Sequence, residues 1–187
     1  MPPSLTVTIY PRPTFRATVH GANASARTCP ARAGRTGSCT LKVGGRRQER
    51  RTITTIDRLN ELLEAERAGV ETLSRLFPEA PSPEIQKLFE GVRNDEAWAC
   101  AGLVRSIKTL GGVASEKKGD FAEKVMSEPT LAARLRFLNR GQGWVVKRLD
   151  ALVGDTLPES VSEFLEEMKR RHVINIEACE RLAESLH

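Results

Sequence analysis

The fold is decided by residues 59–77, LNELLEAERAGVETLSRLF. Apolar residues recur here at spacings of three and four, which is the period of a helix with one buried face. The face has one polar member, Glu66, which lies seven residues from both Leu59 and Leu73. We therefore predict a helix that carries a carboxylate on its buried side. The apolar members of this face are Ile56, Leu59, Leu63, Val70, Leu73 and Phe77.

The same apolar period returns in three later segments, each bounded by helix start and stop signals. Ser82 is a suitable N-cap and Pro83 a suitable first residue for the second helix, while Gly111 and Gly112 supply its end. Thr156 is the expected N-cap of the last helix. The predicted long helices are 52–77, 83–110, 131–153 and 157–186, and a short helix at 120–126 lies within the charged connection 113–129.

The lengths of the connections predict how the helices are arranged. Short loops join the first helix to the second and the third to the fourth, so each of these pairs should be antiparallel. The connection of about 17 residues between the second and third helices can cross the length of a bundle at ~3.3 Å per residue. We predict an all-α fold, a four-helix bundle with one long crossover, in preference to a simple up-and-down bundle.

Each helix has one polar residue where its apolar face would otherwise continue. These residues are Glu66, Glu96, Gln142 and His172. Counting along the hairpins places all four near the middle of their helices and on the buried side. We therefore expect one polar layer inside an otherwise aliphatic core.

Two carboxylates in an apolar layer create a charge that must be compensated, because an isolated buried carboxylate is costly. A divalent ion is one solution, since carboxylate oxygens and an imidazole nitrogen suit Fe, Mn or Zn. The other solution is a hydrogen-bonded network in which His172 is protonated against Glu66 or Glu96 and Gln142 satisfies the remainder. The sequence leaves both open.

Four segments of the chain resemble the ferritin-like superfamily, and more closely an uncharacterised bacterial domain family within it. The resemblance covers residues 55–185 and implies a ferritin-like four-helix bundle. The resembling segments are residues 62–70 (LLEAERAGV), 95–100 (DEAWAC), 137–142 (FLNRGQ) and 168–176 (MKRRHVINI).

The resemblance also implies a ligand set, which this chain keeps only in part. In di-iron members two helices each give a Glu, and the other two each give Glu-x-x-His. Glu66, Glu96 and His172 match three of these six ligands. Ala99, Gln142 and Lys169 stand where the other three belong. A di-iron enzyme is therefore not expected. The three remaining ligands are compatible with a mononuclear site of Glu66, Glu96 and His172, completed by Gln142 or water, which stands beside the structural network as an alternative.

The first 51 residues differ in composition from the rest. Up to residue 50 there are nine Lys and Arg against one acid, a balance of +8, whereas the remaining 20 basic and 23 acidic residues give −3. Five prolines and scattered Gly, Ser and Thr predict a disordered tail with at most a fragile strand near residues 5–10. An alternative is that the tail is a transit-type leader or does not belong to the native protein.

The sequence lacks the motifs of several classes of enzyme and metal site. No nucleotide-binding, hydrolase or zinc-protease motif occurs, and the four cysteines lack metal-site spacing. We expect a cytoplasmic protein without a membrane segment, and a homodimer on the precedent of other bundles. Nucleic acid is expected only through the basic run at 44–51, because the helical part is net acidic. Two functions remain: a ferritin-like protein with a single core metal ion, and a non-enzymatic interaction or scaffold module whose polar layer is structural.

Overall fold

The computed structural model describes the backbone of residues 43–152 and 156–186, with side chains from residue 54 onward. These residues belong to the second of two compact units in the chain, Leu41–His187. The predictions made for residues 1–42 lie outside the described residues. Within the described ranges the regular structure is entirely helical. The elements are α1 (Val43–Leu76), the 3-10 helix η1 (Phe77–Glu79), α2 (Pro83–Thr109), α3 (Phe121–Met126), α4 (Leu131–Asp150) and α5 (Glu159–Ser185).

The start of α1 differs from the prediction. The helix begins at Val43, so the expected start and domain boundary at Thr52 fall inside it. The sequence 46–51, RRQERR, carries no apolar face but consists of Arg, Gln and Glu, which favour helix. An apolar period therefore locates the part of a helix that carries an apolar face and misses a preceding stretch of polar residues that favour helix.

The helix ends follow the expected chemistry with one exception. Ser82 caps α2 by accepting a hydrogen bond from the backbone N–H of Ile85 at 3.4 Å. Gly111, with φ of +79°, occupies the left-handed conformation that ends this helix. The exception is α5, whose N-cap is Pro158 and not Thr156.

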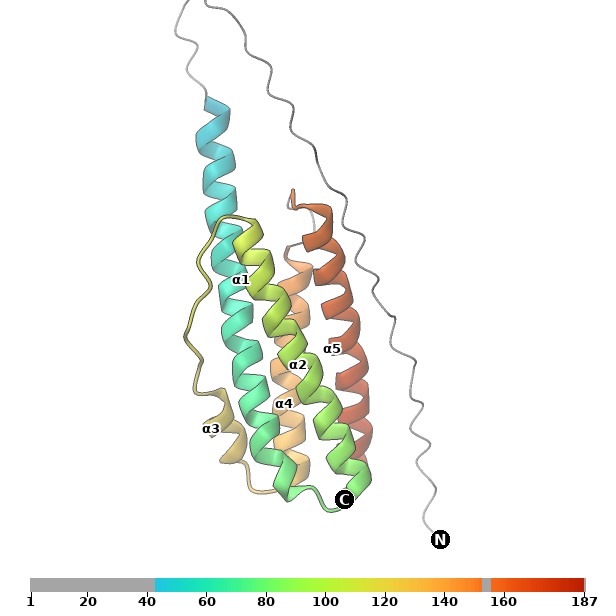
Figure 1. Ribbon diagram of the computed structural model, residues 1–187. Helices are drawn as coiled ribbons and strands as arrows, with labels where there is room; N and C mark the ends of the chain where they lie inside the picture. The colour runs from blue at the N-terminus through green and yellow to red at the C-terminus, as the bar shows by residue number, and fades with distance from the viewer. Residues whose placement is uncertain (1–42, 153–155, 187) are drawn as a thin grey trace, which may run out of the picture. The chain divides into compact units, whose positions relative to one another are not determined.

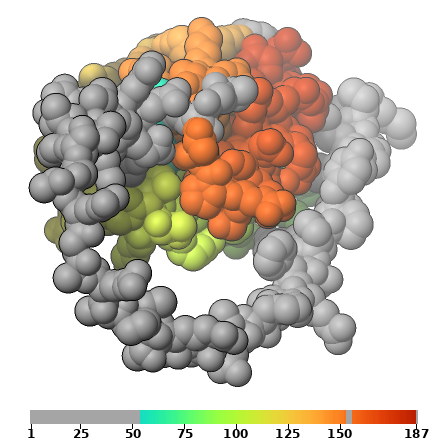
Figure 2. All heavy atoms as spheres, turned by 90° about the horizontal axis from the view of Figure 1, so that it is seen from above, coloured from blue at the N-terminus to red at the C-terminus, as the bar shows by residue number. Residues whose placement is uncertain are grey.

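The four long helices form two antiparallel hairpins, α1–α2 and α4–α5 (Figure 1). The chain leaves the end of α2, runs back along α1 to α3, and enters α4 at the opposite end of the bundle (Figure 1). This path makes α2 and α4 parallel and confirms the predicted long crossover. Viewed from above, the start of α5, in orange, lies beside the end of α2, in yellow-green (Figure 2).

A row of polar side chains on α1 holds the crossover in place. Asn60 donates to the Val113 carbonyl at 3.1 Å and accepts from the Ser115 N–H at 2.7 Å. One turn later Glu64 accepts from the Ser115 hydroxyl, and Arg67 then donates to the carbonyls of Ser115 and Lys117. The spacing 60, 64, 67 is helical, so one face of α1 is committed to the crossover.

The core consists of two apolar clusters, one on each side of the predicted polar layer. The upper cluster lies toward the start of α1, and the lower cluster lies toward its end. No helix in the described ranges has an apolar stretch able to cross a membrane. The upper cluster contains Leu59, Leu62, Leu63, Ala99, Leu103, Ile107, Val145, Leu149, Leu152, Val161, Leu165 and Met168. The lower cluster contains Leu73, Leu76, Phe89, Val92, Leu135, Leu138, Cys179, Leu182 and Ala183.

Candidate metal centre

The polar layer predicted from the sequence is present between the two clusters, with one side chain from each long helix. The exposed fractions are 0% for Glu66 of α1, 3% for Glu96 of α2, 3% for Gln142 of α4 and 2% for His172 of α5. All four are therefore removed from solvent. Their burial follows from the positions they occupy in the apolar period of each helix.

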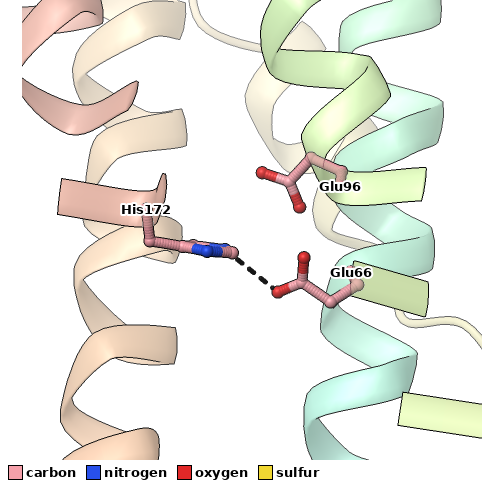
Figure 3. Close-up of side chains that lie close together, drawn as sticks. All are labelled: Glu66, Glu96 and His172. Carbon is pink, nitrogen blue, oxygen red and sulfur yellow. Dashed lines mark hydrogen bonds and ion pairs between the residues drawn. The ribbon is translucent and has the colours of Figure 1, made fainter. Parts of the chain in front are cut away.

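Three of the four residues converge (Figure 3). One carboxylate oxygen each of Glu66 and Glu96 and one ring nitrogen of His172 lie within 4.8 Å of one another. The two carboxylates approach from the α1–α2 hairpin and the imidazole approaches from α5 (Figure 3). Gln142 lies near this group, because it lines the same cavity as Glu96 and His172.

The histidine ring is held in a defined orientation. His172 Nδ1 lies 3.0 Å from the backbone carbonyl of Met168. A carbonyl only accepts, so Nδ1 carries a proton and donates it. The other nitrogen, Nε2, faces Glu66 Oε1 at 3.1 Å. A backbone carbonyl that fixes one ring nitrogen and directs the other inward is the usual support of a metal-ligating histidine.

Burial changes the acidity of both carboxyl groups. It raises the pKa of Glu66 from 4.5 to about 8, although the nearby Glu96 carboxyl group acts in the opposite direction. The pKa of Glu96 is raised well above its ordinary value, first by burial and then by the charge of Glu66, while His172 lowers it. In the absence of a cation burial therefore favours the protonated form of both acids.

The hydrogen bonds of the protein do not satisfy the layer. Within the described part of the chain, Glu66 Oε2 and both amide atoms of Gln142 are buried without a hydrogen-bond partner. A buried polar atom without a partner costs ~1–3 kcal/mol. The purely structural network considered from the sequence is thus incomplete, and the layer has capacity for a further ligand.

A glycine makes room for one of the carboxylates. A Cβ atom built on Gly69 of α1 would lie 2.5 Å from Glu96 Oε2. The Glu96 carboxylate therefore packs directly on the α1 backbone, one turn beyond Glu66. Sequence reasoning did not identify Gly69, and its only signal was a glycine in the middle of a strong helical pattern.

The positions of the missing di-iron ligands exclude a second site of the usual kind. Ala99 belongs to the upper apolar cluster and is 0% exposed. Lys169 points away from the layer and pairs with Asp150 on the surface. Asp95, the residue before Glu96, lies on the flank of α2, where it pairs with Arg171 at 2.9 Å. Only three acidic or imidazole side chains thus meet among the described residues of the layer.

Comparison with a solved structure supports the fold. A crystal structure described as "ferritin like, diiron-carboxylate proteins from Bacillus anthracis str. Ames" superposes with a TM-score of 0.61 at 20% identity. The match covers 71% of this chain and 97% of that one. At this identity the likeness shows the ferritin-like fold alone.

Sequence comparison identifies a family. No curated protein matches the chain. A family described as a domain of unknown function, DUF6306, matches residues 54–181, which span α1 from its first described side chain through most of α5. The chain therefore belongs to the DUF6306 family and has a ferritin-like fold.

Proposed function

We propose that this protein binds a single divalent transition-metal ion, Fe, Mn or Zn, through Glu66, Glu96 and His172. The observation that carries the proposal is the approach of their three ligand atoms to within 4.8 Å of one another in a buried layer. Two carboxylates and one imidazole form a donor set that these metals accept. Gln142 or water fills the remaining positions.

The unsatisfied atoms support a bound ion. Within the described residues Glu66 Oε2 lacks a hydrogen-bond partner, and burial raises the pKa of both carboxyl groups, which disfavours their negative charge unless a cation lies beside them. A divalent cation would replace the protons, and metal binding should release them. Once bound, such an ion would supply Lewis acidity at a position that water occupies.

A single ion is proposed because the second ligand set is missing. Ala99 offers no donor, and Lys169 carries a positive charge and pairs with Asp150 on the surface. Since the di-iron pattern needs Glu-x-x-His on two helices, ferroxidase or di-iron oxygenase chemistry is not proposed.

The rival function is a non-enzymatic interaction or scaffold module in which the layer is structural. The hydrogen bond between His172 and Glu66, at 3.1 Å, favours it because this contact needs no ion. It leaves the second oxygen of Glu66 and the amide of Gln142 unexplained. The metal proposal accounts for the Glu66 oxygen.

Metal analysis of protein purified without chelator separates the two functions. We expect about one ion per chain, or a raised melting temperature when Fe, Mn or Zn is added to protein stripped of metal. Glu66→Gln, Glu96→Gln and His172→Leu should each abolish this response. Glu90→Gln, an exposed position on α2, is the control and should retain it. Absence of stoichiometric metal together with unchanged melting in all three metals would leave the structural module as the function.

A further inference from the structure

A cavity of about 360 Å³ extends from the polar layer between α1 and α4. Glu96, Gln142 and His172 contribute to its lining beside the proposed metal site. Phe121, the first residue of α3, also lines it, together with Gly119 of the crossover. The cavity is therefore bounded by both hairpins and by the segment that joins them. Its volume lies in the lower part of the range for small-molecule sites.

Small residues create this space. One face of α1 lines the cavity with small residues at helical spacing, namely Ala65, Ala68 and Gly69. At these positions α1 therefore carries no long side chain near the polar layer. On the α4 side a Cβ atom at Gly141 would lie 2.5 Å from the Phe121 ring. The absence of a side chain at Gly141 lets this ring close over the helix. Side chains larger than those of Ala65 and Ala68 would reduce the space that is left open.

Gln142 gives the cavity a specific polar group. It is 3% exposed, and within the described residues neither Nε2 nor Oε1 has a hydrogen-bond partner. The amide thus presents one donor and one acceptor side by side to the cavity that it lines. Leu138 and Val145, one turn away on either side along α4, are apolar lining residues. A polar group that matches the amide would lie between these apolar side chains and the polar layer formed with Glu96 and His172.

We propose that this cavity binds a small, largely apolar organic molecule that ends in a carboxamide or carboxylic acid group. This group pairs with the Gln142 amide through a donor and an acceptor, and the apolar body lies against Leu138, Val145 and Phe121. The inference rests on the proposed function in one respect, because it places the polar end of the molecule beside the ion. Binding to the cavity itself does not require the ion.

Three probes of similar size test the inference by calorimetry on the full chain, both stripped of metal and loaded with it. The probes are hexanamide, hexanoic acid and methyl pentanoate, of which the ester has no donor. We expect saturable binding of hexanamide and about tenfold weaker binding of the ester, because the ester leaves Gln142 Oε1 unpaired. Hexanoic acid should bind more strongly at pH 4, where its carboxyl group is protonated and can both donate and accept, than at pH 7, where the carboxylate only accepts.

Two variants assign the binding to this cavity. Gln142→Met keeps the length of the side chain and should remove the preference for amide over ester. Ala65→Met should fill the cavity and weaken all the probes at least tenfold. Gln86→Met is the matched control, since Gln86 lies half-buried near the start of α2 and does not line the cavity.

The outcomes separate this inference from the metal proposal. Equal binding of amide and ester, or no binding of any probe to protein that does bind metal, would overturn the inference alone. Hexanamide binding that is lost in Gln142→Met supports it even where no metal binds. A Gln142→Met variant that loses metal while its preference for the amide persists would make Gln142 a metal ligand and overturn the inference.

Discussion

The two hairpins supply different chemistry to the same layer of the core. The α1–α2 hairpin contributes two carboxylates, Glu66 and Glu96, whereas α4–α5 contributes an amide, Gln142, and an imidazole, His172. All the acidity of the layer therefore belongs to one half of the bundle. The α4–α5 half brings Nε2 of His172 within 3.1 Å of Glu66 Oε1 but contributes no carboxylate to the layer. Under the metal proposal, the ion would therefore take most of its negative ligand charge from the first hairpin.

The largest expected effect concerns the acidity of the first hairpin. In metal-free protein the folded state holds the Glu66 proton up to about pH 8, whereas an unfolded chain releases it near 4.5. Folding then requires proton uptake, so stability falls as the pH rises through this window. Relative to Glu66→Gln, the free energy of unfolding of the wild type should fall by roughly 3–5 kcal/mol between pH 4.5 and 8.

Urea unfolding in the presence of a chelator, over a series of pH values, measures this difference. Glu90→Gln, at an exposed position on α2, should follow the wild-type curve. If the free energy of unfolding changes with pH in the same way for wild type and Glu66→Gln, Glu66 does not retain its proton in the folded state. The two hairpins would then not differ in acidity as described above.

Adding a carboxylate to the second hairpin, α4–α5, should remove the difference in acidity between the two hairpins. Gln142→Glu places a third acid in the layer, and we expect metal-free protein at pH 8 to lose ~3 kcal/mol of unfolding free energy. A divalent ion should restore more stability to this variant than to the wild type. Gln86→Glu, outside the layer, should change stability by less than ~0.5 kcal/mol. Equal metal responses of Gln142→Glu and wild type would place residue 142 outside the reach of the ion.

The next effect tests how closely the first hairpin is packed. Gly69→Ala changes no ligand but introduces a Cβ that meets Glu96 Oε2, so the carboxylate must move. We expect the metal affinity, measured by competition with a chromophoric chelator, to fall about tenfold, which is the size of effect seen when support of a ligand is lost. Gly91→Ala has open space around its Cβ and should stabilise α2 by ~0.5–1 kcal/mol without changing affinity. Unchanged affinity in Gly69→Ala would show that Glu96 can ligate from another position.

The smallest effect concerns the crossover that joins the hairpins. Arg67→Met removes the hydrogen bonds to the Ser115 and Lys117 carbonyls and should cost ~1 kcal/mol. Amide hydrogen exchange should accelerate at residues 113–118 and remain nearly unchanged in α4 and α5. Arg105→Met, at an exposed site on α2, serves as the comparison. A uniform acceleration over the whole bundle would mean that the crossover does not open independently.

The sequence predicted the parts of this molecule that depend on periodicity. The apolar period placed Glu66, Glu96, Gln142 and His172 on buried faces at similar depth, because the spacing along a helix determines both direction and height. Helix caps such as Ser82 also followed from local rules. These features are properties of one helix or of one short loop.

Features that depend on contacts distant in sequence were not predictable in this way. The hydrogen bond that orients His172, the clearance at Gly69 and the cavity beside Gln142 exist only when particular helices pack at a particular distance. The attachment of the crossover to Arg67 joins residues about 50 positions apart. No local pattern encodes such distances.

The division of the three ligands between the hairpins has a kinetic consequence. An ion held by Glu66, Glu96 and His172 would be bonded to α1, α2 and α5, and would act as a removable cross-link between two halves that meet elsewhere mainly through aliphatic contacts. Separation of the halves would then have to wait for release of the ion. The lifetime of the native state, more than its structure, would therefore depend on how much metal is available.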